Sequence, residues 1–138
     1  MRVITELHIK VRGQGLNDIT PAVRSAVREA DMDEGLCHLY IRHTSASLLI
    51  QENYDPSVRV DLENWLNRLV PENDPLYTHT LEGPDDMPAH IKCALTATSL
   101  AIPVMDGDLA LGTWQGIYLM EHRDRPHRRQ VALKFLQG

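Results

Sequence analysis

The part of this 138-residue chain that most constrains its fold is residues 82–90, Glu82-Gly83-Pro84-Asp85-Asp86-Met87-Pro88-Ala89-His90. Pro84 and Pro88 each fix φ and remove a backbone donor, so the stretch cannot continue a strand and can enter a helix only near its end. Gly83 permits a turn that most residues resist. The sequence therefore predicts a stiff loop that leads into a helix.

Acidic side chains and an imidazole project from this predicted loop. Hard oxygen ligands and an imidazole in one rigid segment suit a divalent metal site or a site of proton transfer. Glu82, Asp85 and Asp86 are therefore candidate catalytic residues, and His90 is a candidate metal ligand. The alternative is an acidic surface turn that only caps the helix.

Composition limits the class of protein. The length fits one domain, residues 1–138, and 43% of the residues are apolar, enough for a core. The net charge of −5 argues against a general nucleic-acid binder, because phosphate backbones need a basic surface. Cys37 and Cys93 lie far apart, and we see neither a signal peptide nor a membrane span, so a cytoplasmic chain is the simplest expectation.

Hydrophobic periodicity and proline positions predict the secondary structure. We expect strands at residues 2–12, 36–42, 48–50, 77–81, 100–105, 109–122 and 131–136. Helices are expected to begin at Thr20-Pro21 and Asp55-Pro56 and to follow Pro88, and Asp106-Gly107 predicts a hairpin. We expect the second helix to pack into the core and the last strand to pair with the strand before it. Hairpins outnumber crossovers, which favours an α+β fold with a mainly antiparallel sheet and about three helices.

The histidines supply the second functional signal. Four of seven, His43, His79, His90 and His122, lie at predicted element ends, where sites are usually built. Three imidazoles that converge with a carboxylate or water would suit zinc or another divalent ion. No His-Glu-x-x-His spacing is present, so such a site depends on the fold. His43 continues an apolar strand face, as a core histidine would, yet it also opens a hydroxyl-rich segment at residues 43–47.

Several motifs together resemble one known family. They are His43-Thr44-Ser45-Ala46-Ser47, Asn53, Asp55-Pro56, Asp61-Leu62-Glu63, His79, residues 82–92, Leu111-Gly112-Thr113-Trp114-Gln115-Gly116-Ile117-Tyr118, and Glu121-His122-Arg123. The chain resembles the YjbQ-like family of secondary thiamine-phosphate synthases over nearly its whole length. Cys93 departs from this pattern, because the family usually has a small residue such as serine there. A thiol at that position can add a soft ligand or simply pack.

The resemblance implies a two-layer domain, a homotrimer with a site near the subunit interface, and a weak thiamine-phosphate synthase activity. In that reaction, the nitrogen of a thiazole phosphate displaces pyrophosphate from hydroxymethylpyrimidine diphosphate. From the histidine pattern, we expect metal ligands, for zinc or magnesium, at His79, His90 and His122. We expect catalytic roles for His43, Glu82, Asp85 and Asp86, and contacts to a small phosphorylated substrate from Ser45, Asn53, Lys92, Trp114, Gln115 and Arg123.

Three hypotheses remain open at this stage. In the first, Glu82, Asp85 and Asp86 hold magnesium for the synthase reaction, although the chain has no glycine-rich phosphate loop. In the second, the histidines hold zinc in a hydrolase of a small substrate. In the third, the protein is a non-enzymatic trimer that binds a ligand, and the histidines serve subunit packing.

Overall fold

The computed structural model describes residues 4–138, which form eight strands and three helices. The helices are α1 (Thr20–Ala30), α2 (Pro56–Leu69) and α3 (Asp86–Leu95). The strands are β1 (Ile4–Val11), β2 (Gly15–Asp18), β3 (Gly35–Ile41), β4 (Ala46–Glu52), β5 (Ser99–Met105), β6 (Asp108–Leu109), β7 (Gln115–Glu121) and β8 (His127–Gln137). The first residues of the strand expected at 2–12 lie outside the described range.

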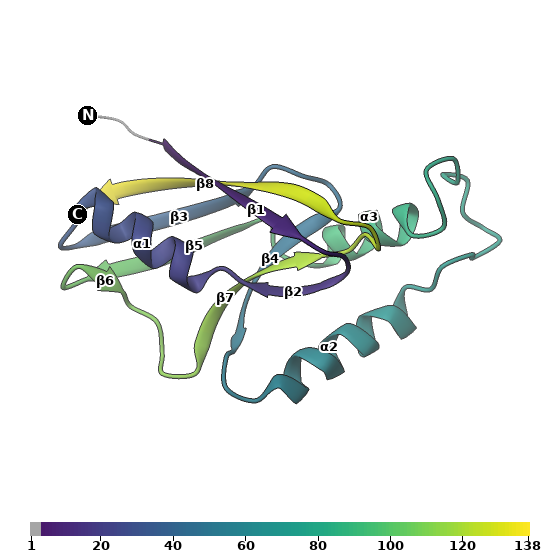
Figure 1. The fold of residues 1–138 in the computed structure, drawn as a ribbon, viewed down its shortest axis with the longest axis horizontal. Coiled ribbons are helices and arrows are strands. Elements are labelled where there is room, and N and C mark those ends of the chain that lie inside the picture. The colour runs from purple at the N-terminus through teal and green to yellow at the C-terminus, as the bar shows by residue number, and fades with distance from the viewer. Residues whose placement is uncertain (1–3) are drawn as a thin grey trace.

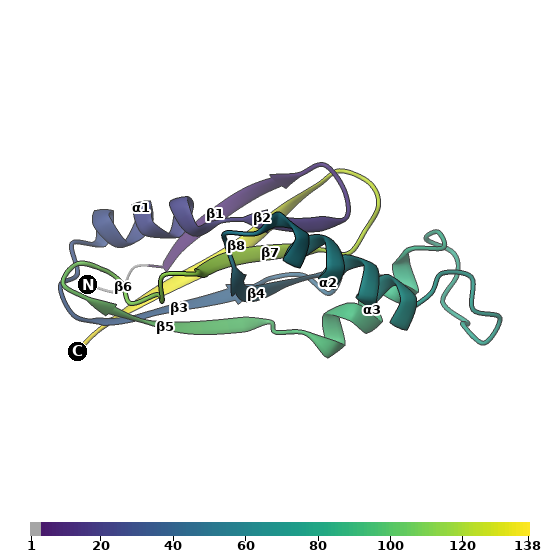
Figure 2. The ribbon, with the colours of Figure 1, turned by 90° about the horizontal axis from the view of Figure 1, so that it is seen from below.

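The strands form two antiparallel sheets, as expected for an α+β fold. The larger sheet has the order β1-β8-β3-β5-β6, and the smaller one has the order β2-β7-β4. Figure 1 shows α1 at the end of the molecule that carries the C-terminus, whereas α3 lies at the opposite end. Figure 2 shows α1 and the strands β3 and β5 as separate layers. Among the described residues, no helix has the length and apolar character needed to cross a membrane.

One aliphatic core joins these layers. α1 contributes Val23, Ala26 and Val27, which are at most 6% exposed. Alternate residues of β3, including Leu39, meet them from the larger sheet, and Leu48 and Leu119 meet them from the smaller sheet. Apolar residues recur every three or four positions in α1 and at every second position in the strands. This spacing buries one face of each element. No residue of α3, at the opposite end of the molecule, belongs to this core, and polar contacts hold that end instead.

The local signals for the first two helix starts and the hairpin are confirmed, whereas the third helix begins at Asp86, two residues before Pro88. The Asp55 carboxylate accepts a hydrogen bond from the Ser57 backbone amide at 2.9 Å, and Pro56 opens α2. Asp106 and Gly107 both have positive φ, 53° and 79°, in the turn between β5 and β6. A two-residue hairpin of this hand requires that conformation, which aspartate and glycine tolerate.

Three strand predictions are wrong. Residues 77–81 form no strand but part of an irregular segment between α2 and α3, where prolines at both ends limit pairing. The strand expected at 109–122 is interrupted after β6, because the chain turns through residues 110–114 and leaves one sheet for the other. The last strand, β8, pairs with β1 and β3 rather than with β7. Pairing between distant segments depends on the assembled sheets, which local periodicity does not encode.

The prediction that α2 packs into the core is also wrong. None of its residues is buried, and Val60, Trp65 and Leu69 are each more than half exposed. Its half-buried face mixes apolar residues such as Leu62 and Leu66 with two polar residues that contact the smaller sheet. Arg59 donates to the Tyr118 hydroxyl at 3.1 Å, and Glu63 accepts from the Leu16 amide at 3.0 Å. The spacing of apolar residues predicts the helix correctly, and Val58, Leu62 and Leu66 of that stripe are half-buried, but Trp65 and Leu69 are exposed.

Candidate metal centre

The residues expected from the acidic loop converge at the start of α3. Asp86 is the first residue of this helix, and His90 follows one turn later, so both side chains lie on one face. His79 reaches them from the irregular segment that precedes the helix. The donor atoms of these three residues all lie within 4.8 Å of one another. A carboxylate and two imidazoles thus form one compact group, called here the His79–Asp86–His90 group.

The two imidazoles meet the same carboxylate oxygen. His79 Nε2 lies 2.6 Å from Asp86 Oδ2, and His90 Nε2 lies 3.2 Å from it. His90 Nδ1 lies 3.0 Å from the Thr44 carbonyl, which can only accept. Nδ1 therefore carries the hydrogen, and when His90 is neutral the lone pair of Nε2 is directed at a negatively charged oxygen. Two acceptors that face each other in this way call for a cation or a proton between them.

Arg123 holds the carboxylates from the other side. Its Nη1 lies 2.8 Å from Asp86 Oδ1, and its Nε donates to Asp85 Oδ2 at 2.9 Å. Asp85 also accepts from the Asp124 amide at 2.9 Å. Burial would raise the pKa of Asp86, but the contact with His79 and the charge of Arg123 outweigh it and hold this pKa below its usual value. Asp86 therefore remains an anion, as a metal ligand must be.

Glu82 and Arg123, which neighbour Asp86, also line an open hollow. It has a volume of about 530 Å³ and is lined by Glu82, Arg123, Arg125 and His127, together with Leu81, Gly83 and Pro126. The side chain of Glu82 is exposed, and its carboxyl lies beside Asp86. Glu82 and Arg123 thus link the hollow to the His79–Asp86–His90 group, although none of the three residues of the group lines it.

His122, an expected metal ligand, lies apart from this group. It is 2% exposed, and its Nε2 is 2.9 Å from the hydroxyl of Ser47. Burial, together with the charges of Lys92 and Arg129, lowers the pKa of His122 to about 3. His122 is therefore neutral at physiological pH and serves an internal hydrogen bond.

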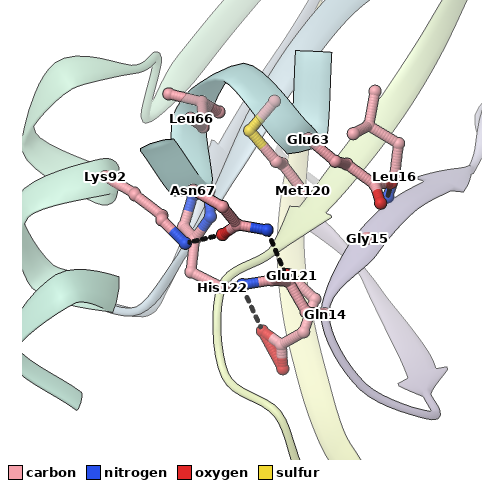
Figure 3. Close-up of a pocket in the computed structure, with 10 residues that line it drawn as sticks. All are labelled: Gln14, Gly15, Leu16, Glu63, Leu66, Asn67, Lys92, Met120, Glu121 and His122. Carbon is pink, nitrogen blue, oxygen red and sulfur yellow. Dashed lines mark hydrogen bonds between the residues drawn. The ribbon is translucent and has the colours of Figure 1, made fainter. Parts of the chain in front are cut away.

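Lys92 also points away from the His79–Asp86–His90 group. The amine of Lys92 donates to Asn67 Oδ1 at 2.6 Å, and Asn67 Nδ2 donates to Gln14 at 3.0 Å. Figure 3 shows this chain of contacts beneath α2, with His122 in the same small pocket. Burial lowers the pKa of Lys92. Lys92 thus ties α3 to α2, on the side of α3 away from His90.

Two further candidates near the loop have internal partners. His43 Nε2 accepts a hydrogen bond from the Gln130 amide at 2.8 Å, and burial and the charge of Arg129 lower the pKa of His43. Ser45 accepts from Arg129 at 2.9 Å. The core-histidine alternative therefore describes His43 better than a catalytic role does.

Cys93 packs as well. Its thiol lies 3.2 Å from the Ala46 carbonyl, and burial raises its pKa.

The remaining expected substrate contacts form a separate cluster at the other end of β7. The Asn53 amide donates to the Trp114 carbonyl at 2.9 Å, and its side chain donates to the Gln115 carbonyl at 3.4 Å. Gln115 begins β7, whereas Glu121 ends it, so about 20 Å of strand separates the cluster from Arg123 at a rise of ~3.4 Å per residue. Within one chain, these side chains cannot meet the same small substrate as the His79–Asp86–His90 group.

Sequence reasoning missed several groups that shape the site. The Thr44 carbonyl orients His90, but a backbone acceptor carries no signature in the sequence. Asn67 has the sequence context of a solvent-facing helix residue. Glu121 did carry a signal, since a glutamate within an apolar run requires a buried partner, and Arg129 is that partner at 2.6 Å.

Fold and site together define a single-domain α+β protein with a His-Asp-His group at a helix start. The family model described as UPF0047 protein YjbQ-like matches residues 5–138. A UPF0047 protein of Synechocystis is 50% identical over 92% of this chain and 86% of its own length. The YjbQ protein of Escherichia coli O157:H7 is 44% identical over 96% of this chain and 95% of its own.

The solved structures agree with these relatives. The crystal structure of an uncharacterised YjbQ/UPF0047 protein from Clostridium acetobutylicum has a TM-score of 0.88 and 37% identity, covering 96% of this chain and 99% of the other. A conserved hypothetical protein from Thermus thermophilus has a TM-score of 0.86 and 35% identity, covering 96% and 99%. This chain belongs to the UPF0047, YjbQ-like family, as the motifs predicted. The descriptions of these proteins assign no activity.

The depressed pKa of His122 generates a prediction about stability. The unfolded chain binds a proton at this residue near pH 6.5, whereas the folded chain does so only near about pH 3. Neutral His122 therefore makes its full contribution to the free energy of unfolding above about pH 6.5. This contribution is lost as the pH falls from about 6.5 toward about 3. We expect the unfolding free energy of wild type to fall more steeply between about pH 6.5 and 4.5 than that of His122→Gln, by ~1–2 kcal/mol.

Urea denaturation at several pH values measures this difference, and His8→Gln, at an exposed strand position, is the matched control. Parallel pH profiles for wild type and His122→Gln would contradict the burial effect.

Proposed function

We propose that this protein is a metal-dependent enzyme whose ion is bound by His79, Asp86 and His90. The observation that carries the proposal is the convergence of His79 Nε2 and His90 Nε2 on one oxygen of Asp86, at 2.6 and 3.2 Å. Two nitrogens and one oxygen favour zinc or another first-row ion over magnesium, which prefers six oxygens. Asp85 is engaged by Arg123, so a magnesium site built from Glu82, Asp85 and Asp86 is the less favoured arrangement.

The surroundings suit chemistry on a small phosphorylated substrate. A bound ion would supply Lewis acidity and lower the pKa of a water molecule. Glu82, exposed beside Asp86, is placed to accept a proton from a reacting group. Arg125 lines the neighbouring hollow, and its guanidinium suits phosphate oxygens. His79 is 45% exposed and His90 33% exposed at their side chains, so a substrate can reach the ion from solvent.

This donor set favours hydrolysis as the first reaction to consider. The thiamine-phosphate synthase reaction is the second candidate, and the cationic hollow beside the ion supports it. In that step, the thiazole nitrogen forms a bond to the pyrimidine methylene carbon as the bond from that carbon to pyrophosphate breaks. The cation and the hollow would stabilise the departing pyrophosphate. Trp114 is too distant within one chain to stack on the pyrimidine, so stacking would require a neighbouring subunit.

We also propose that the protein is a homotrimer in which α2 contacts a neighbouring subunit. The helix leaves Val60, Trp65 and Leu69 exposed. Trp65 and Leu69 lie one turn apart on the same face of the helix, and large neighbouring apolar residues that are exposed are typical of a protein interface.

A cytoplasmic location fits the two cysteines, which are buried free thiols.

Metal binding tests the first proposal. Protein purified without a histidine tag is expected to bind close to one zinc ion per chain, measured by elemental analysis after dialysis. Asp86→Asn keeps the shape but removes the charge and should lose most of the metal, as should His90→Ala. His38→Ala, a histidine of β3 outside the group, is the control. Less than about a tenth of an ion per wild-type chain after incubation with zinc would reject the site, since an assembled site should bind tightly.

Turnover separates the candidate reactions. Metal-loaded wild type, given hydroxymethylpyrimidine diphosphate and thiazole phosphate, should form thiamine phosphate if the synthase reaction belongs to this site. Phosphate release from simple phosphate esters reports hydrolysis. Asp86→Asn should reduce either activity by at least about 100-fold, since the ion would be lost. If Asp86→Asn forms as much product as wild type, the activity does not depend on the His79–Asp86–His90 group. If wild type turns over none of these substrates, a non-enzymatic ligand-binding protein is favoured.

The α2 face generates a prediction about assembly. Light scattering after size exclusion should give three times the chain mass for wild type. Trp65→Glu should shift the protein toward a monomer, because a charge would replace an apolar contact. Met105→Glu, also on an exposed apolar side chain but near the β5–β6 turn, is the control. A wild-type monomer, or a trimer unchanged by Trp65→Glu, would contradict the proposed role of α2.

A further inference from the structure

Arg123 has almost no donor left for a substrate. Its Nε and Nη2 donate to Asp85 at 2.9 and 3.5 Å, its Nη2 donates to the Glu82 carbonyl at 2.9 Å, and its Nη1 lies 2.8 Å from Asp86. The side chain is only 12% exposed. These contacts raise the pKa of Arg123, chiefly through the hydrogen bond to Asp85. Arg123 was expected to contact a phosphate group of the substrate, but its guanidinium already donates to acceptors within the protein.

The three partners of Arg123 lie within five residues of one another. The Glu82 carbonyl belongs to the turn, Asp85 precedes α3, and Asp86 opens it. Gly83 adopts φ of 103° between them, and a β-carbon at this position would meet Asp85 Oδ1 at 3.2 Å. A planar guanidinium with five donors can satisfy such a set at fixed angles, whereas an ammonium group cannot. The turn and the helix start are thus held as one unit by a residue that follows β7.

The two carboxylate oxygens of Asp86 have different partners. Arg123 Nη1 approaches Oδ1, whereas His79 and His90 both face Oδ2. With Oδ1 engaged, only Oδ2 is directed at the space between the imidazoles. A carboxylate without this partner could turn and offer both oxygens to an ion.

We propose that Arg123 is a positioning residue that makes Asp86 a ligand through one oxygen only and keeps the remaining coordination positions of the ion open for substrate. This inference rests on the proposed metal site. It also assigns phosphate contact to the wall of the hollow, at Arg125, rather than to Arg123. Hydrogen-bond partners behind a ligand commonly set both its orientation and the affinity of the metal.

Cobalt binding tests this role without any knowledge of the substrate. Wild type titrated with Co²⁺ should give the intense visible bands of a four-coordinate ion, with Asp86 bound through one oxygen and a water in the fourth position. Arg123→Gln and Arg123→Lys should bind Co²⁺ roughly 10–100-fold more weakly. Their bands should be weaker too, because Asp86 could then bind through both oxygens and raise the coordination number. Circular dichroism and thermal melts establish whether each variant is folded.

Two further variants separate positioning from general stability. Asp85→Asn removes the main anchor of Arg123 without touching the ligands, and it should shift the Co²⁺ spectrum in the same direction. Arg128→Gln removes an exposed arginine of β8 that does not line the hollow, and it should leave both the affinity and the spectrum of Co²⁺ unchanged. A purely structural role for Arg123 would lower the melting temperature of its variants but leave the spectrum of the folded fraction unchanged.

The outcomes distinguish this inference from the proposal beneath it. If wild type binds neither Co²⁺ nor Zn²⁺, the metal site and the role of Arg123 both fail. If wild type binds Co²⁺ and a folded Arg123→Lys or Arg123→Gln variant binds it with wild-type affinity and spectrum, only the role of Arg123 is overturned. Loss of affinity with a changed spectrum in either folded Arg123 variant, and in Asp85→Asn, supports it.

Discussion

Three consecutive residues at the end of β7 hold together the elements that form the site. Glu121 pairs with Arg129 of β8 at 2.6 Å, His122 contacts Ser47 of β4 at 2.9 Å, and Arg123 engages Asp85 and Asp86 at the start of α3. Glu121 is 1% exposed, and its charge is tolerable because Arg129 meets it through several hydrogen bonds. Loss of one member of such a buried pair costs about 3–5 kcal/mol, since the other charge is left without a partner.

This junction explains why the site lies at one end of the molecule. Aliphatic side chains of α1 and both sheets fill the interior, so a cluster of charges can exist only where the strands end. The segment between α2 and α3 has little apolar packing of its own, and polar contacts position it instead. Arg123 fixes the turn, Thr44 fixes the ring of His90, and Lys92 connects α3 to α2. A site held by directional contacts can present its donors at fixed angles to an ion.

The same geometry divides the residues that the motifs had grouped together. His79, Asp86 and His90 meet at one end of β7, while Asn53, Trp114 and Gln115 meet at the other. Both clusters are exposed at the surface, and in one chain they are too far apart for one small substrate. The exposed apolar face of α2 gives a reason to place a neighbouring subunit against this molecule. If the two ends are used together, they must come from different subunits.

The sequence by itself determined the features that depend on short-range chemistry. Pro56 and Asp55 start α2, Asp106 and Gly107 take the positive φ of a tight turn, and the four-residue spacing of Asp86 and His90 puts both on one helix face. Only the tertiary structure decided that His79 joins them and that His122 does not, and that α2 stays outside the core. The physical reason is distance along the chain. Propensity and periodicity act over a few residues, whereas strand pairing, burial and the partner of each charge are set by segments far apart in sequence.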